Sequence, residues 1–585
     1  MSILTTFITS SLAIKCNHVQ SFYQEHACCS DPNGQFSTPQ CDLAEFQTIN
    51  AKRLYHGGFK SSLASALDAF MENGALLNKF PMSPENTTFS ATNFVSISAR
   101  KGHDEFHRTY GVNSKTGVAY PHDAEVPSIY YSSTKLIANI VGTMFMERAV
   151  IGLDEPVWRY LPEYHSDGDV TNQLSVYPLH VIRPLPLGTP EDATTVTVDG
   201  TVFNIKTHSF TNFPAGDVKY YEEPVPLSDY PTLRQFMTHT DGSAGYGAFV
   251  APLYGTASEI PRNFLAHAVT VDMEMVAYGA TDPLAYYGPF FTVGLFGDRL
   301  SVPMVAHAQF GKLVLYPGKG SHYSWSNAVV GRISEVAYAK YNGHTVSDDS
   351  IRFQDVAKEM LWDKVGVDKS AFSIPTTSPL YPYYNSSYAY GVTSTATAES
   401  SKDTPNWSLG AGSFRDAFAT YSITALGDMG MYSTAKDYLK MMSLLLNGLA
   451  PDGTRLMRDS TARLLSTIPM SHTFDEAEHE KSGNLYRDIP TIRTLGGAVM
   501  SERLHPYRFD DAYISGVHTY GDMNYVGHMS SDGLDLTSWG GAAGTKWTVD
   551  TNANYLYSFQ TNVASSPGPH WLSEQISGLI QDHTF

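Results

Sequence analysis

Apolar residues follow two different periods along this chain, and each period predicts a type of element. Residues 92–99 are rich in β-branched side chains and partly alternate, which predicts a strand. The long apolar run 136–151 predicts a buried helix, because apolar residues occur on all of its sides. A second helix is predicted over 438–446, and Thr434 followed by Asp437 has the pattern of an N-terminal cap.

A serine followed three residues later by a lysine occurs at 98–101, 132–135 and 433–436. At the start of a helix this spacing places the hydroxyl and the ammonium on one face. The first copy belongs to the predicted strand, where neighbouring side chains diverge, and the third belongs to the predicted helix cap. The copy at 132–135 differs, because an aromatic, β-branched stretch precedes it and a long apolar helix follows it. We therefore expect Ser132 to be a nucleophile that Lys135 can deprotonate, which is the chemistry of a covalent acyl-enzyme.

Five segments in order resemble the serine β-lactamase and penicillin-binding-protein superfamily, and within it the class C-like family VIII carboxylesterases. The first is 132–135, and the second, 153–164, is similar to the family stretch LDDPV…YLPEF. The third, 232–242, is similar to the family helix and turn ITLRHLLTHTSG. The fourth and fifth are 323–333, similar to the catalytic-tyrosine segment, and 539–545, similar to the esterase form of the third motif. Five ordered matches are far more specific than one.

The resemblance implies an α/β (α+β) fold of the β-lactamase/transpeptidase type, in which an antiparallel sheet is flanked by helices and a mainly helical subdomain is inserted. For this chain it implies an N-terminal extension over 1–85 and a catalytic domain over 86–585. The α/β part would comprise about 86–165 and 425–585, and the inserted part about 166–424.

The resemblance also implies the roles of individual residues. Ser132 would carry the acyl group, and Lys135 or Tyr323 would take its proton; which of the two acts as the base stays open. Tyr323 would then protonate the leaving alcohol or activate the water that releases the acyl group. The N–H groups of Ser132 and Ala542 would form the oxyanion hole. The implied pocket residues are Trp325, Trp539, Gly540 and Gly541, and no metal or organic cofactor is implied.

Two positions depart from the β-lactamase pattern. The third motif of β-lactamases and D-Ala-D-Ala enzymes carries a lysine or histidine that binds the substrate carboxylate, whereas this chain has Trp539 there. An apolar ring cannot make that charge-assisted bond. Trp325 stands where β-lactamases have an asparagine that hydrogen-bonds the substrate amide. Both departures favour carboxylic esters with apolar acyl groups as substrates.

Four alternatives to ester hydrolysis remain open. An acyltransferase with the same three residues would pass the acyl group to an alcohol other than water, as lovastatin-type transacylases do. A D-amino-acid amidase, peptidase or β-lactamase is disfavoured by the missing cation in the third motif. The last two are a non-catalytic scaffold that assembles into filaments and a small-molecule binder, both of the same fold.

Charge and hydropathy exclude some classes of partner. The chain has 585 residues, with 39 basic against 58 acidic side chains and a net charge of −19. This charge disfavours binding to nucleic acid or to anionic membranes. No apolar run reaches the roughly 18 residues of a membrane span. The expected partner is a small-molecule ester, while the oligomeric state and the compartment are left open.

The N-terminal extension and three insertions have no predicted place in the chemistry. The extension holds all the cysteines, which allow two disulfides in three pairings or, less favourably, a zinc site. The insertion 165–231 predicts a β-hairpin with its turn at Asp199-Gly200, placed over the site. The insertion 243–303 is a candidate pocket wall, and 374–424 is a candidate lid. The cysteines are Cys16, Cys28, Cys29 and Cys41.

Overall fold

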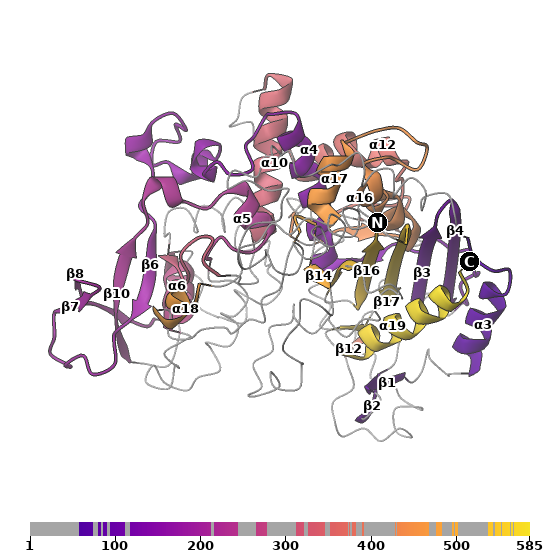
Figure 1. Cartoon of the computed structure of the whole chain (residues 1–585), viewed down its shortest axis with the longest axis horizontal. Coiled ribbons are helices and arrows are strands. Elements are labelled where there is room, and N and C mark those ends of the chain that lie inside the picture. The colour runs from indigo at the N-terminus through magenta and orange to yellow at the C-terminus, as the bar shows by residue number, and fades with distance from the viewer. Residues whose placement is uncertain are drawn as a thin grey trace, which may run out of the picture.

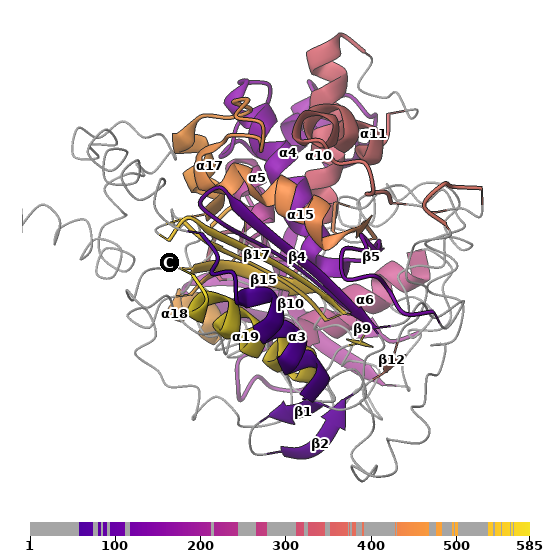
Figure 2. The same cartoon turned by 90° about the vertical axis from the view of Figure 1, so that its right-hand side faces the viewer.

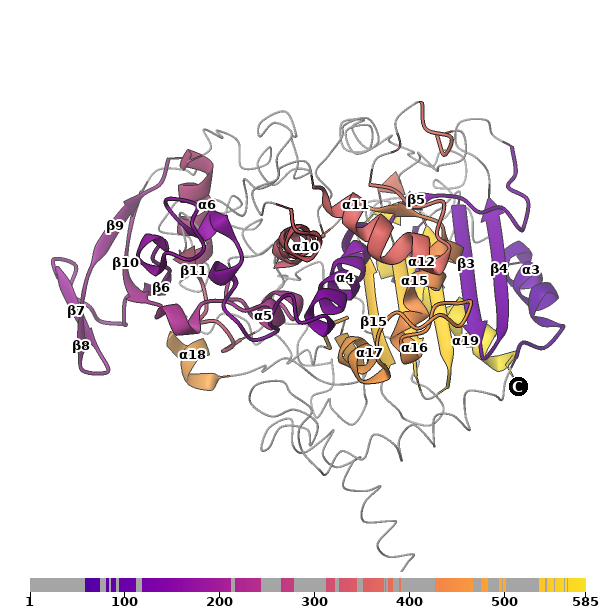
Figure 3. The same cartoon turned by 90° about the horizontal axis from the view of Figure 1, so that it is seen from above.

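The elements of the chain form a mixed α/β structure, which confirms the predicted fold class (Figure 1). Two sheets lie side by side along the long axis, and helices pack on and between them (Figures 1 and 3). The computed structural model describes residues 58–73, 80–83, 86–90, 94–111, 118–211, 216–243, 265–277, 312–320, 326–344, 351–372, 374, 377–381, 389–390, 427–428, 430–466, 475–481, 494–496, 498–500, 536–541, 544–551, 553–561, 563–564 and 567–584.

The central sheet has six antiparallel strands and joins the two ends of the described chain. Its strand order is β14-β15-β16-β17-β3-β4, so strands from both ends of the sequence lie side by side. In the register of the sheet Trp539 pairs with Trp547, and Ser558 pairs with Ser98. The strands are β3 (Phe94–Lys101), β4 (Asp104–Gly111), β14 (Ala498–Met500), β15 (Leu536–Gly541), β16 (Thr545–Asp550) and β17 (Tyr555–Thr561).

Helices α3 (Leu63–Asn73) and α19 (Pro567–Asp582) cover one face of this sheet (Figure 1). Alternate residues of β3 and β17 point toward them, because side chains of a strand alternate between its faces. Helix α3 lies within the range predicted as an N-terminal extension, yet it contributes to this core, and the division into domains stays a prediction. The buried cluster is Leu63, Leu67, Met71, Val95, Ile97, Ala99, Tyr110, Tyr555, Tyr557, Phe559, Leu572, Ile576 and Ile580.

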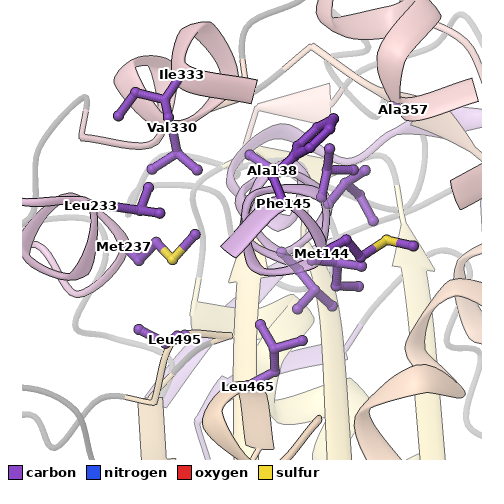
Figure 4. Packing of buried hydrophobic residues seen from close by; sticks show 14 of the residues in the cluster. Ala138, Met144, Phe145, Leu233, Met237, Val330, Ile333, Ala357, Leu465 and Leu495 are labelled. Carbon is purple, nitrogen blue, oxygen red and sulfur yellow. The ribbon is translucent and has the colours of Figure 1, made fainter. Parts of the chain in front are cut away.

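A second layer of helices lies on the opposite face (Figure 2). Its central member, α4 (Lys135–Glu147), is buried from Lys135 to Phe145, which explains the apolar run in the sequence. Figure 4 shows α4 surrounded by side chains of other elements, among them Met237 and Val330. The helix ends before the predicted residue 151, because Ala149 has a left-handed φ of 55° just past the cap. The other helices here are α15 (Ala435–Met442), α16 (Leu444–Asn447) and α17 (Asp459–Ser466).

The range 166–424, predicted as a mainly helical insertion, contains a second sheet as well as helices. The predicted hairpin is present as β7 (Thr195–Val198) and β8 (Thr201–Asn204), with positive φ at Asp199 and Gly200 in its turn. It lies at the outer end of the molecule, away from the start of α4, so its predicted position over the site is wrong (Figures 1 and 3). The second sheet has the order β11-β6-β10-β9, with β6 (His180–Pro184), β9 (Lys206–Ser209), β10 (Asp217–Pro224) and β11 (Lys312–Leu313). The helices are α5 (Leu233–Met237), α6 (Leu265–Ala277) and α10 (Ser326–Asn342).

The remaining elements are short. In the part of the chain that the structure describes, no helix is both long and apolar enough to cross a membrane. The short strands are β1 (Phe80–Ser83), β2 (Asn86–Ser90), β5 (Ser128–Ile129), β12 (Ala389–Tyr390), β13 (Tyr432–Ser433) and β18 (Val563–Ala564). The short helices are α11 (Phe353–Ala357), a π-helical turn (Lys358–Trp362), α12 (Asp363–Val365) and α18 (Glu476–Lys481), with 3₁₀ turns at Tyr131–Thr134, Val157–Arg159, Pro162–Tyr164, Gln173–Ser175 and Leu227–Asp229.

Candidate active site

Ser132 lies in a tight turn between a strand and a helix. Strand β5 enters the turn and pairs with β13, a 3₁₀ turn over Tyr131–Thr134 follows, and α4 begins at Lys135. Tyr131 has a φ of 43°, in the left-handed region that a bulky residue adopts at a cost. The Ser132 side chain is only half-buried, while Ser133 and Thr134 beside it are fully buried. The turn thus keeps one serine accessible at the start of a buried helix.

Two stacked tyrosines hold this turn in place. The rings of Tyr130 and Tyr438 lie parallel, with centroids 4.3 Å apart and 7° between their planes. Tyr438 donates a hydrogen bond from its hydroxyl to the carbonyl of Ser133 at 2.8 Å, and the Tyr130 hydroxyl lies 3.0 Å from Ser558 Oγ. Burial raises the pKa of both phenols well above its ordinary value. Both tyrosines therefore stay neutral and hold the turn in place.

The end of strand β15 packs directly against the same turn. A methyl group added to Gly541 would put its carbon 2.1 Å from the carbonyl oxygen of Tyr130, so only glycine fits there. Thr545 Oγ1 donates to that carbonyl at 3.1 Å and lies 3.1 Å from Ser133 Oγ. The predicted pocket residues Gly540 and Gly541 thus end a strand beside Ser132. Ala542, the predicted second oxyanion donor, follows Gly541 in sequence and lies outside the described residues.

Lys135 reaches Ser132 and a buried aspartate. Its Nζ donates to Ser132 Oγ at 3.4 Å and to the backbone carbonyl of Asp428 at 3.1 Å. The same Nζ lies 2.9 Å from Asp428 Oδ1, and the two side chains are 4% and 0% exposed. The structure thus brings the two predicted residues together and adds Asp428, which the sequence reasoning missed.

Close packing of glycines brings Asp428 to Lys135. A Cβ on Gly427 would lie 2.8 Å from Ala138 Cβ of α4 and 2.9 Å from Gly331 Cα of α10. Two buried amides bridge the same pair of helices, because Asn327 Nδ2 donates to Asn139 Oδ1 at 2.5 Å. Gly331 and Gly427 lie far apart in the sequence. They therefore indicate this close approach only once the pairing of α4 with α10 is known.

The start of α10 is tied to the turn after α5. Ser326 Oγ donates to Asp241 Oδ1 at 2.5 Å, and both side chains are buried. Ser326 begins α10, and the predicted residues Tyr323 and Trp325, just ahead of it, lie outside the described residues. Asp241 is a second residue that sequence reasoning did not single out, although it lies in a segment that resembles the family.

Trp539, another predicted pocket residue, is buried on β15 and stacks on His239. The two rings are 6.4 Å apart with 18° between their planes. His239 belongs to the same turn as Asp241 and has a positive φ of 56°. The third-motif strand and the turn after α5 therefore meet through an aromatic contact.

The two competing serine–lysine pairs have the structures that the sequence predicts. Ser98 lies in β3 and contacts His107 Nδ1 at 2.8 Å, while Lys101 donates to the carbonyl of Ala553 at 2.5 Å. Thr434 caps α15, since its Oγ1 accepts a hydrogen bond from the N–H of Asp437 at 3.0 Å. Both predictions are confirmed. Over the described ranges, no group of three His, Cys, Asp or Glu side chains is placed to hold a metal ion.

Comparisons with known proteins bear on the fold. No protein-family model matches this sequence, and no curated protein matches it. Among solved structures, simvastatin synthase (LovD) from Aspergillus terreus is similar with a TM-score of 0.50 and 15% identity, over 88% of this chain and 96% of that one.

Two further solved structures are also similar. EstCE1, described as a hydrolase with promiscuous acyltransferase activity, has 16% identity and a TM-score of 0.47, over 92% of this chain and 99% of its own. A family VIII carboxylesterase has 12% identity and a TM-score of 0.45, over 89% and 96%. With its antiparallel sheet between two helical layers, the chain has the β-lactamase/transpeptidase-like fold that the sequence analysis predicted.

Proposed function

We propose that the chain is a serine hydrolase that acts on carboxylic esters through an acyl-Ser132 intermediate. The observation that carries the proposal is the contact of Lys135 Nζ with Ser132 Oγ at 3.4 Å, at a strained strand–turn–helix junction beside a glycine-ended strand. Nucleophile, lysine and candidate oxyanion strand thus come from three elements that converge on one turn. This is the arrangement that acyl transfer through serine needs.

In the proposed reaction the oxygen of Ser132 bonds to the ester carbonyl carbon while its proton passes to a base. The carbonyl oxygen becomes an oxyanion, for which the N–H of Ser132 and that of Ala542 are the proposed donors. Collapse of the intermediate breaks the ester C–O bond, and the leaving alcohol takes the proton, for which Tyr323 is the proposed carrier. Water then attacks the acyl carbon while its proton passes to the base, the bond between the acyl carbon and Ser132 Oγ breaks, and Oγ takes that proton back as the acid is released.

Acyl transfer to an alcohol is the second candidate. The structure at TM-score 0.50 is named for a synthase, and EstCE1 is named for both activities. The two reactions share the acyl-Ser132 intermediate and differ only in its acceptor. Amide or β-lactam substrates are less well supported, because Trp539 is buried against His239 and offers no cation for a substrate carboxylate.

The test is intact mass after incubation with a fluorophosphonate or with p-nitrophenyl butyrate. We expect one adduct on the wild type, none on Ser132→Ala, and an unchanged adduct on Ser433→Ala and Ser98→Ala, since these serines belong to the two other serine–lysine pairs. An adduct that survives Ser132→Ala would refute the proposal, and no adduct at all would favour a binder or scaffold.

Once the adduct is established, an added alcohol separates the two reactions. Ester product that forms faster than free acid would assign the chain as an acyltransferase, while free acid alone would assign it as an esterase. Rapid turnover of a chromogenic cephalosporin would instead favour a β-lactamase.

A further inference from the structure

Asp428 is a buried carboxylate that the proposed reaction does not yet use. Its side chain is fully buried, and its Oδ1 lies 2.9 Å from Nζ of Lys135, which is itself only 4% exposed. The backbone carbonyl of Asp428 accepts a hydrogen bond from the same Nζ at 3.1 Å. One residue thus offers the lysine both a formal negative charge and a carbonyl dipole.

An opposite charge this close favours the charged form of a lysine, and burial strengthens the attraction because little water screens it. An isolated buried lysine would instead favour its neutral form. The carboxylate therefore decides between the two roles that the sequence left open for Lys135. A lysine that keeps its proton donates to Ser132 Oγ, as the 3.4 Å contact allows, and cannot accept the serine proton.

We infer that Asp428 is a positioning residue that keeps Lys135 as an ammonium ion beside Ser132, so that the base for Ser132 is a group other than Lys135. The inference rests on the proposed function and deepens it. In acylation the Ser132 proton then passes to that second group, for which Tyr323 is the proposed candidate. The ammonium stabilises the negative charge that develops around it.

Several other ionisable groups in the described elements around the turn have partners of their own or face away from it. Tyr130 and Tyr438 stay neutral, because burial raises their pKa values. Asp241 accepts a hydrogen bond from Ser326 Oγ. Lys546 follows Thr545 in β16, so it lies on the opposite face of the sheet. On α10 and α17 the described ion pairs are Arg332 with Glu163 and Glu335, and Arg463 with Asp459.

The test replaces the charge of Asp428 and leaves its size. Asp428→Asn keeps a side-chain oxygen and the backbone carbonyl but removes the negative charge. Lys135 should therefore lose its proton at a lower pH in this variant than in the wild type. We expect the alkaline limb of the rate of Ser132 labelling by a fluorophosphonate to move down by about 1 to 3 pH units. We expect Asp428→Glu to restore part of the wild-type profile.

Asp437→Asn is the matched control. Asp437 is also a fully buried aspartate, and its Oδ1 lies 2.8 Å from Nζ of Lys440. Its substitution removes a comparable buried charge without touching Lys135, so its labelling profile should coincide with that of the wild type. A similar loss of stability in both variants, measured by urea unfolding, would show that destabilisation alone does not move the profile.

Two results would overturn the inference. The first is a pH profile of Ser132 labelling that Asp428→Asn leaves unchanged. The second is an acidic limb that Asp428→Asn moves to lower pH, with faster labelling there, because this would show that Lys135 is the base. Neither affects the proposed function, which fails only if Ser132 in the wild type is not labelled.

A measurement on the wild type covers the case in which Asp428→Asn does not fold. Titration of the lysine side-chain nitrogens by ¹⁵N NMR, with Lys135→Met for assignment, should show an ammonium at Lys135 up to about pH 10, the ordinary range of lysine. A neutral amine near pH 7 would refute the inference.

Discussion

Gly541→Ala tests whether the end of β15 shapes the nucleophile turn. The added carbon would lie 2.1 Å from the Tyr130 carbonyl oxygen and 2.5 Å from Thr545 Oγ1. Real Cβ atoms essentially never approach other atoms within 3.0 Å, so strand and turn must separate by about 0.9 Å. A misplacement near 1 Å can cost on the order of 100-fold in rate. The strain itself should cost about 1 to 3 kcal/mol of unfolding free energy.

The assay compares second-order labelling of Ser132 by a fluorophosphonate with urea unfolding of the same samples. Gly448→Ala is the control, because its added carbon would lie 2.2 Å from the Met457 carbonyl oxygen, at the end of α16. We expect both variants to lose stability and only Gly541→Ala to lose about 100-fold in labelling rate. Folded Gly541→Ala that labels within about threefold of the wild type would refute the proposed role of this strand.

Three further predictions concern the surroundings of the site. Tyr438→Phe leaves the Ser133 carbonyl without its hydrogen bond and should lower the unfolding free energy by about 1 to 3 kcal/mol in urea; an unchanged midpoint would contradict this. Thr434→Ala removes a helix cap and should cost about 1 kcal/mol in the same assay, with Ser132 labelling unchanged. Burial raises the pKa of Glu125, but hydrogen bonds and charges of Lys369 and Lys436 outweigh it and lower the pKa from 4.5 to about 2. The stability difference between wild type and Glu125→Gln should therefore be full above pH 4.5 and vanish as the pH falls to about 2; a difference that persists at pH 2 would contradict it.

Local patterns predicted the elements around the site well, because each depends on neighbours in sequence. The β-branched stretch around Ser98 forms a strand, and Thr434 caps its helix through the N–H three residues on. The run after Ser132 forms a helix that is buried on all sides. The predicted end of this helix was wrong. The left-handed residue just past its cap is Ala149, and no glycine or proline stands there to mark the stop. The hairpin was predicted, but its place relative to the site depends on long-range packing that a turn sequence does not contain.

The residue that sets the charge of Lys135 could not be predicted from the sequence. The spacing of Ser132 and Lys135 predicts that the two side chains meet, and it is the same whether the lysine accepts or donates a proton. Asp428 makes that distinction, yet it is 293 residues from Lys135, in a glycine-flanked stretch that alone indicates only a turn. It reaches the lysine because Gly427 and Gly331 let the backbones approach closely, which is a property of the packed helices. A serine–lysine motif therefore specifies a geometry, whereas the role of its lysine depends on the charge that the fold places beside it.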